Sequence, residues 1–136
     1  MESLSDVIAV DTNIVVRLIV ADDDAQVALA LGLANRELLY VGMTVLLETE
    51  WVLRSKYHFD RTSVCSALLD FGDLPFVQFE ADQDIRWALA RYAEAGELAD
   101  YIHIAAARQV GRFATFERRL NRRAGDAPPA RIETLI

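Results

Sequence analysis

The chain has 136 residues, of which 53% are hydrophobic and 26% are charged, and its formal net charge is −7. This length favours a single domain over residues 1–136, and the apolar content excludes a disordered chain. One cysteine, Cys65, and two histidines, His58 and His103, are too few for an internal disulfide or a zinc site.

The apolar runs near the N-terminus are short. Val7–Val10 is followed at once by Asp11, and Ile14–Ala21 contains Arg17. Neither run approaches the roughly 20 apolar residues of a membrane-spanning helix. Residues 1–6 carry two acids and no base, which is unlike a signal peptide. We therefore expect a cytoplasmic protein that does not contact a membrane.

Basic residues are concentrated near the C-terminus. Residues 108–131 hold seven arginines and two acids, whereas residues 1–107 are strongly acidic. An arginine patch of this kind is able to hold a phosphate backbone. A solvated helical face explains the same pattern, so charge alone leaves both interpretations open.

The pattern of the first half predicts short strands that alternate with helices. We expect Val7–Val10 to be a strand buried on both faces, because it is a continuous apolar run rich in β-branched residues. The other expected elements are a helix opening at Asp22–Asp24, a strand at Leu38–Val41, a helix over Thr44–Lys56, and a helix that starts after Asp60 or Thr62 and ends near Gly72.

The second half continues this alternation. Its expected elements are a strand at Phe76–Phe79, helices at Asp82–Glu94 and Leu98–Val110, a strand at Phe113–Phe116, a short helix at Glu117–Arg123 and a last strand at Arg131–Ile136. Strands separated by helices predict an α/β fold with a parallel sheet. Ligands of such sheets bind beyond the carboxyl ends of the strands.

Two acids of the first half are candidates for a site at that edge. Asp11 follows the first expected strand directly, although capping of a helix by Asp11, Thr12 or Asn13 explains it equally well. Glu48 has mostly apolar helical neighbours, so we expect a buried carboxylate that needs a partner. Glu50 is instead expected to form a surface ion pair with Arg54, four residues later.

Three further acids follow in the second half. Asp100 opens an apolar helix, and Glu97 precedes it by three residues. Glu117 lies just beyond the strand expected at Phe113–Phe116. Stabilisation of helix N-termini explains each of these acids singly. One parallel sheet would gather the whole set at one edge, where carboxylates without histidine or cysteine favour Mg²⁺ or Mn²⁺.

Four segments that contain these acids resemble the PIN-domain family, and within it the VapC-type toxins of type II toxin–antitoxin pairs. They are residues 10–18 (VDTNIVVRL), 45–55 (VLLETEWVLRS), 98–103 (LADYIH) and 113–117 (FATFE). The resemblance implies a three-layer α/β sandwich with a central, mostly parallel sheet of four or five strands flanked by helices.

The resemblance also assigns roles to residues. It implies that Asp11, Glu48, Asp100 and Glu117 are catalytic, and that these four and Glu97 bind the metal. Glu97 and Glu117 stand where the family usually has aspartate, which lengthens each side chain by one methylene. Thr12, Asn13 and Thr115 are expected to orient the acids or water molecules.

The implied activity is metal-dependent cleavage of RNA by water that Mg²⁺ or Mn²⁺ activates. We expect Arg118, Arg119 and Arg122 to contact the RNA backbone. The resemblance further implies a cognate antitoxin that blocks the acidic site, and a homodimer. It does not indicate which RNA is cleaved.

Three alternatives differ from this interpretation. A catalytically weak PIN domain would serve as an RNA- or protein-binding module. A nuclease of DNA or of ribosomal precursors would use the same fold. A phosphotransfer enzyme with an aspartyl nucleophile would suit Asp11, but Asn13 stands where one such class needs aspartate, and Lys56 is misplaced for the other.

Overall fold

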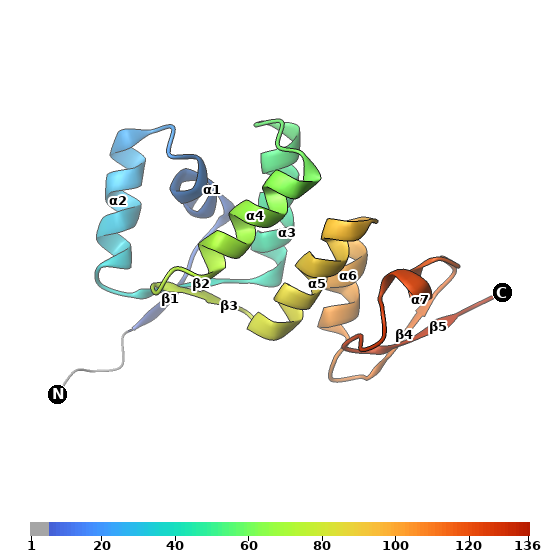
Figure 1. Ribbon diagram of the computed structural model, residues 1–136. Coiled ribbons are helices and arrows are strands. Elements are labelled where there is room, and N and C mark those ends of the chain that lie inside the picture. Colours follow the sequence, from blue (N-terminus) through green and yellow to red (C-terminus); the bar gives the residue numbers. More distant parts are fainter. Residues whose placement is uncertain (1–5) are drawn as a thin grey trace. The chain divides into compact units, whose positions relative to one another are not determined.

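The computed structural model describes residues 6–136, so residues 1–5 of the predicted single domain lie outside the described part. Five strands and seven helices occur in the described residues (Figure 1). The chain divides into two compact units, residues 1–80 and residues 81–136.

The first unit contains three strands and four helices. They are β1 (Val7–Ala9), α1 (Thr12–Val20), α2 (Asp24–Ala34), β2 (Leu38–Val41), α3 (Met43–Ser55), α4 (Arg61–Gly72) and β3 (Val77–Phe79). Helix α1 packs against α2 and α3, and α4 packs against α3 and β3. Fully buried aliphatic side chains from α1, β2, α3 and α4 form its core: Val15, Leu39, Val41, Leu46, Leu53, Val64 and Leu68.

The second unit contains three helices and two strands. They are α5 (Asp82–Glu94), α6 (Leu98–Ala106), β4 (Arg112–Thr115), α7 (Leu120–Arg123) and β5 (Arg131–Thr134). Its core joins α5 to α6, where the Trp87 and Tyr101 rings meet edge to face with centroids 5.9 Å apart. The fully buried Ile85, Leu89 and Ile104 complete this contact.

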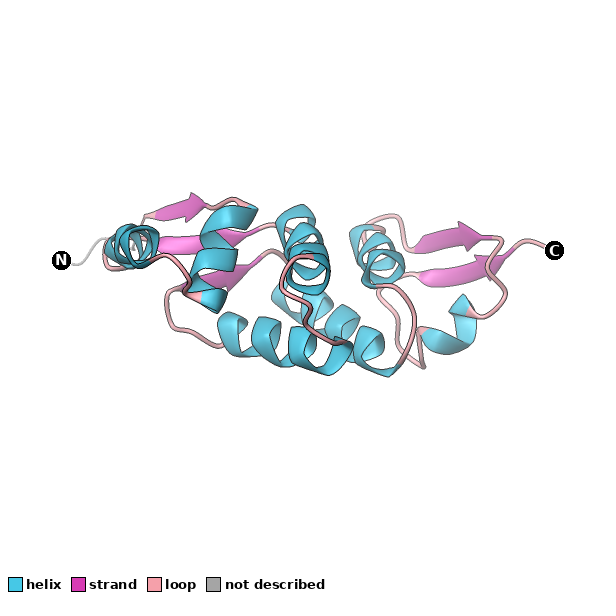
Figure 2. Cartoon of the chain, turned by 90° about the horizontal axis from the view of Figure 1, so that it is seen from above, coloured by secondary structure: helices cyan, strands magenta, loops and turns pink. Residues whose placement is uncertain are grey.

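All strand pairs are parallel, as expected. Strand β2 lies between β1 and β3, with Val7 opposite Leu38 and Val41 opposite Phe79, and β4 pairs with β5. The α/β class with parallel strands is therefore confirmed. The five described strands, however, are hydrogen-bonded as a three-stranded and a two-stranded sheet rather than as one sheet of four or five strands (Figure 2). Hydrophobic periodicity locates strands but does not specify their partners.

The predicted boundaries hold closely for most elements and fail for two helices, and the predicted burial fails for one strand. The run Val7–Val10 was expected to be buried on both faces, but the three residues of β1 are exposed and Val10, just beyond the strand, is buried. Strand β1 is an edge strand of its sheet, where fewer neighbours cover the side chains.

Helix α6 ends at Ala106, not at Val110. Beyond Ala106 the backbone N–H groups of Ala107, Arg108 and Val110 donate to the carbonyl three residues earlier, and not four residues earlier as in an α-helix. Helix α7 begins at Leu120 rather than at Glu117, because the N–H of Glu117 donates to the hydroxyl of Thr115 in a turn that precedes the helix.

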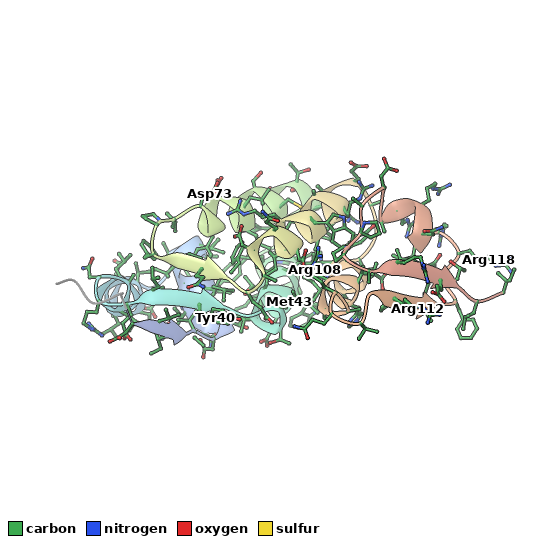
Figure 3. All side chains as sticks on the ribbon, turned by 90° about the horizontal axis from the view of Figure 1, so that it is seen from below. Tyr40, Met43, Asp73, Arg108, Arg112 and Arg118 are labelled. Carbon is green, nitrogen blue, oxygen red and sulfur yellow. The ribbon has the colours of Figure 1, made fainter. Side chains whose placement is uncertain are left out.

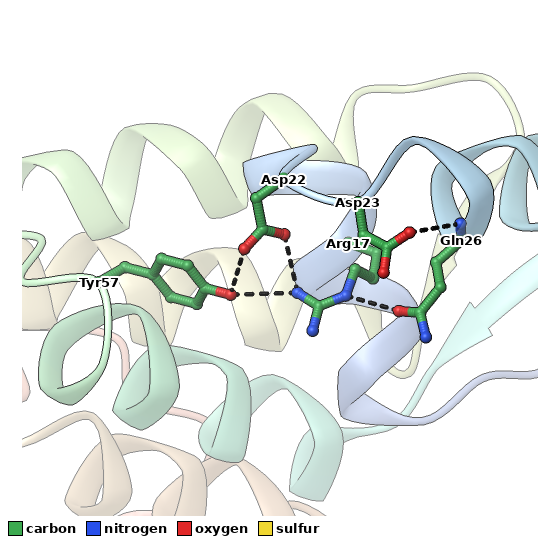
Figure 4. A network of polar contacts seen from close by, with 5 residues as sticks. All are labelled: Arg17, Asp22, Asp23, Gln26 and Tyr57. Carbon is green, nitrogen blue, oxygen red and sulfur yellow. Dashed lines mark hydrogen bonds and ion pairs between the residues drawn. The ribbon is translucent and has the colours of Figure 1, made fainter.

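A polar network joins the turn between α1 and α2 to the end of α3 (Figure 4). An Nη atom of Arg17 donates to Asp22 at 2.9 Å and to the hydroxyl of Tyr57 at 3.1 Å. That hydroxyl donates to the second oxygen of Asp22 at 2.9 Å, and Arg17 Nε donates to Gln26 at 2.7 Å. Ala21, in the same turn, adopts a left-handed conformation with φ of 57°. The network therefore holds a turn that its own backbone does not favour.

An ion pair between a buried carboxylate and an exposed arginine joins the two main helices of the second unit. Asp84, in the first turn of α5, is 7% exposed. Both of its oxygens accept hydrogen bonds from Arg108, just beyond α6, at 2.6 and 2.8 Å. A carboxylate removed from water needs such a partner. No helix in residues 6–136 is both long enough and apolar enough to span a bilayer.

We expect Asp84→Ala to lower the free energy of unfolding of the second unit by about 2–3 kcal/mol, because it removes two charge-assisted hydrogen bonds at a buried carboxylate. Urea denaturation followed by tryptophan fluorescence measures this loss in a Trp51→Phe background, in which Trp87 is the remaining tryptophan. Asp82→Ala is the control, since its pair with Arg86 is more exposed and should contribute less than about 1 kcal/mol. Equal losses in the two variants would contradict the assignment.

Candidate metal and RNA site

The parallel strands of the first unit end at one edge of their sheet. Asp11 lies two residues beyond β1, helix α3 starts at Met43 just after β2, and Glu80 directly follows β3. This edge is therefore where the first unit presents carboxylates.

Asp11 caps helix α1. Its Oδ1 accepts a hydrogen bond from the backbone N–H of Ile14 at 3.1 Å, and its extended backbone is typical of an N-cap residue. The capping explanation thus holds for Asp11 rather than for Thr12 or Asn13. Asp11 is exposed, and its second carboxylate oxygen has no hydrogen-bond partner within residues 6–136. Capping therefore leaves this oxygen available to a ligand.

Thr12 connects this cap to α3. Its hydroxyl donates to Oε1 of Glu48 at 2.6 Å, and Thr12 is only 8% exposed. The structure thus brings Asp11 and Glu48 to neighbouring positions on either side of one threonine. Asn13 is exposed and makes no side-chain hydrogen bond among the described residues.

The environments of the two glutamates in α3 are the reverse of those predicted. Glu48 is exposed, whereas Glu50 is 4% exposed. The expected pair is present, since Arg54 Nε lies 2.7 Å from Glu50, but it is not a surface pair. Helical spacing identified apolar neighbours of Glu48, yet it did not show which face of α3 the other helices cover.

Glu80 was missed by the sequence analysis. Its Oε1 accepts a hydrogen bond from the backbone N–H of Met43 at 2.7 Å, at the start of α3. Gly42, the N-cap residue, has no side chain to satisfy this N–H. The position of Glu80 directly after the third expected strand is the sequence feature that could have identified it as a site residue. Glu80 holds the N-terminus of the helix that carries Glu48.

Glu97 and Asp100 lie at the start of α6 in the second unit. Glu97 is the exposed N-cap residue and makes no capping bond with its side chain, and Asp100 is half-buried in the first turn. The preceding turn requires Gly96, which has φ of +90° and on which a Cβ would lie 2.6 Å from the Tyr101 hydroxyl. This turn fixes where the two acids begin the helix.

Thr115 and Glu117 form a tight turn after β4. The Thr115 hydroxyl accepts a hydrogen bond from the N–H of Glu117 at 3.0 Å, which delays the start of α7. The carboxylate of Glu117 accepts from the backbone N–H of Arg119 at 3.0 Å and from its Nε at 3.3 Å. The hydrogen bond from the backbone N–H of Arg119 is the largest cause that lowers the pKa of Glu117, and the bond from the Arg119 side chain is the next largest. Glu117 is thus already partnered by a cation.

The predicted RNA-binding arginines differ in their surroundings. Arg119 is occupied by Glu117. Arg118 is exposed and points away from its unit, as the labelled side chain in Figure 3 shows. Arg122 is also exposed, and no carboxylate of the described residues lies within ion-pair distance of Arg118 or Arg122. Two of the three are therefore free to contact an anion.

The comparison with protein families gives one match. The family model of the PIN domain matches residues 8–126, a range that runs through both units.

The chain belongs to the PIN-domain family.

PIN domains are generally nucleases that need a divalent metal ion. No match was found among curated proteins or among solved structures.

The acids of this PIN domain fall into two groups by their partners. Several pair with arginine, as Glu50, Asp84 and Glu133 do. In contrast, Asp11, Glu48, Glu97 and Asp100 have no basic partner among residues 6–136. Carboxylate oxygens without cationic partners are the donors that Mg²⁺ and Mn²⁺ prefer. This donor set fits a hard divalent ion, although neither described unit by itself brings together three such side chains.

We expect Arg119→Ala to raise the pKa of Glu117 part of the way back to its ordinary value of 4.5. The variant removes the charge and the Nε–H donor but keeps the backbone N–H, so the pKa stays below 4.5. A pH titration of the carboxyl carbon by NMR measures the change. Arg118→Ala should leave this titration unaltered, and an equal rise in both variants would show that general surface charge is responsible.

Proposed function

We propose that this PIN-domain protein is a metal-dependent endoribonuclease and the toxin of a VapC-type toxin–antitoxin pair. The observation that carries the proposal is the set of acids without cationic partners, Asp11, Glu48, Glu97 and Asp100, in a family of metal-dependent nucleases. In the first unit, the hydroxyl of Thr12 connects Glu48 to the segment that begins at Asp11, and a bound cation would neutralise these two carboxylates. The family-like segments of the sequence favour RNA as the substrate.

In this proposal Asp11, Glu48 and Asp100 hold Mg²⁺ or Mn²⁺, and Glu97 and Glu117 assist. The ion, when bound, would lower the pKa of a coordinated water and so supply the nucleophile for a phosphodiester. The carboxylate of Asp11 keeps one oxygen on the helix N-terminus, which fixes its orientation. The hydroxyl of Thr12 fixes Glu48 in the same way. Glu117 would first have to release Arg119, so we assign it the smallest share of the metal site.

The proposal treats residues 1–136 as one domain that acts in the cytoplasm. The range of the family match supports one domain, because it includes acids of both units. A cognate antitoxin and a second copy of the chain are the proposed protein partners. Exposed apolar side chains on α2 and α3, Leu29, Leu31 and Trp51, are suitable contacts for either partner.

A specific observation favours a second candidate, a PIN domain that binds RNA without efficient cleavage. The carboxylate of Glu117 is held by Arg119, and it stands where the family usually has aspartate. A site that lacks this acid would have fewer metal ligands. Metal-dependent cleavage of RNA distinguishes the two candidates.

We expect the purified protein to cleave a mixed RNA pool with Mg²⁺ or Mn²⁺ and not with chelator. Asp11→Asn and Asp100→Asn should each reduce the rate by at least about 100-fold, because each removes a charged metal ligand. Asp24→Asn, an exposed acid of α2, is the matched control and should cleave normally. Folded protein, free of inhibitor, that cleaves no RNA in any metal would favour the binding module.

We also expect Thr12→Val to weaken Mn²⁺ binding by about tenfold, because Glu48 loses the hydrogen bond that orients it. Isothermal calorimetry with Mn²⁺ measures this directly and needs no cleavage. Thr12→Ser keeps a hydroxyl and should restore the affinity. If valine and serine variants bind Mn²⁺ as tightly as the parent protein, Thr12 has no positioning role.

A further inference from the structure

The second unit contains a basic cavity that the proposed metal site does not use. Its volume is about 360 Å³, and it is lined by Arg91, Glu94, Ala95, Tyr101, Arg122 and Arg123. Three guanidinium groups thus surround one concave surface between the ends of α5 and α7. Arg122 was expected to contact RNA, whereas no such role was expected of Arg91.

Arg91 is fixed in place within this cavity. Its Nε donates to the backbone carbonyl of Arg123 at 2.7 Å, which joins α5 to the end of α7. A Cβ placed on Gly125 would lie 2.9 Å from an Nη atom of Arg91, so the guanidinium packs tightly over that glycine. The side chain is only 26% exposed. Its remaining Nη donors are therefore oriented in advance and partly withdrawn from water.

Arg122 and Arg123 have no carboxylate partner. No acid of residues 6–136 lies within ion-pair distance of either side chain, whereas Arg54, Arg108 and Arg112 all have such partners. Both residues lie in the last turn of the four-residue helix α7. The dipole of a four-residue helix is small, so two cations are more than its C-terminal end needs.

Glu94 is the acid that offsets this charge. Its carboxylate lies 3.7 Å from an Nη atom of Arg91, a long ion pair, and the side chain is 72% exposed. An exposed side chain can turn toward water when an anion enters. Three arginines and one carboxylate leave the cavity net positive even without that movement.

We propose that this cavity binds one phosphate group of the RNA backbone, which extends the proposed ribonuclease function to substrate binding in the second unit. Planar guanidinium groups match the geometry of phosphate oxygens and bind them through paired hydrogen bonds. The aromatic ring in the lining, Tyr101, is fully buried and donates its hydroxyl to Ala95 at 2.6 Å. It offers no face for base stacking, so the cavity contributes affinity and not sequence choice.

An acidic peptide is the competing ligand class. The anchor residues of protein partners are enriched in Trp, Tyr and Arg. An aromatic anchor needs an apolar lining, and a cluster of arginines would repel an arginine anchor. The cavity presents four charged side chains instead, and Ala95 is the small apolar residue among them. The lining therefore favours a phosphodiester.

The test combines inorganic phosphate and a fluorescein-labelled single-stranded RNA, both with the protein made inactive by Asp11→Asn. NMR of the arginine Nε–H groups follows phosphate, and fluorescence anisotropy at several salt concentrations follows RNA. The loss variant is Arg122→Gln with Arg123→Gln, and the gain variant is Glu94→Gln. Arg131→Gln is the control for charge, since Arg131 is an exposed arginine of the same unit that pairs with Glu133.

We expect phosphate to shift the resonances of Arg91, Arg122 and Arg123. The double variant should lose this response and bind RNA about tenfold more weakly, with a salt slope lower by about 0.7. Glu94→Gln should bind both probes more tightly than the parent protein, and this gain does not depend on whether the double variant folds.

Three results would overturn the inference. The first is an absence of phosphate response with RNA affinities equal to that of Arg131→Gln. The second is phosphate binding with unchanged RNA affinity, which would assign the cavity to free phosphate. The third is displacement of phosphate by an acidic peptide but not by RNA. Cleavage by the parent protein is measured in parallel, so normal cleavage with any of these results leaves the ribonuclease proposal intact. Binding of phosphate and RNA without any cleavage would instead reject the proposed ribonuclease activity and leave the phosphate-binding cavity supported.

Discussion

The parallel pairing of β1, β2 and β3 is the constraint on which the first unit depends. It sends the three chain segments that follow these strands to one edge of the sheet. Asp11 and Glu80 lie there because each follows a strand, and Glu48 is brought there by the helix that starts after β2. The hydrogen bonds from Thr12 to Glu48 and from Met43 to Glu80 then connect neighbouring segments of this edge. Local capping and the candidate metal ligands are thus parts of one arrangement.

Charge is divided unequally between the two units. Residues 1–80 hold thirteen acids and five bases, whereas residues 81–136 hold eight acids and nine arginines. In the second unit most acids are used to fix structure, as Asp84 and Glu133 do. The two arginines beside Glu133 hold its pKa at about 2, so it stays ionised in any ordinary buffer. The arginines of the second unit without a carboxylate partner among residues 6–136 are those of α7 and Arg118, and two of them line the cavity proposed to bind phosphate.

The sequence was sufficient for the class of the fold and for most boundaries. Runs such as Leu38–Val41 and Asp82–Glu94 have strong periodicity and clear end signals, and both match the structure residue for residue. The sequence did not indicate which strands pair with which, because strand pairing depends on contacts between distant residues that no local pattern encodes. The burial of Glu48 and Glu50 was reversed for the same reason. Periodicity shows that a helix has two faces, but packing decides which one is covered.

The candidate site was predictable only as a set of acids that follow strands or lie on helices. Capping by Asp11 and the turn made by Thr115 follow from general side-chain chemistry. The role of Glu80 and the pairing of Glu117 with Arg119 do not, because the first is a contact across 37 residues and the second depends on the shape of one turn. Residue types indicated the chemistry of the site, whereas the hydrogen-bond partners of each side chain became known only from the three-dimensional structure.

The network of Arg17, Asp22 and Tyr57 has a consequence for local unfolding. It joins a turn near residue 21 to the end of α3, which lies 35 residues later in the chain. Neither segment is able to open without breaking these hydrogen bonds, so the two open as one cooperative unit. Amide protons at the end of α1 and at the end of α3 should therefore exchange with solvent through a shared opening event, although no backbone hydrogen bond connects them. Side-chain contacts alone would make two distant turns behave as one element of native-state dynamics.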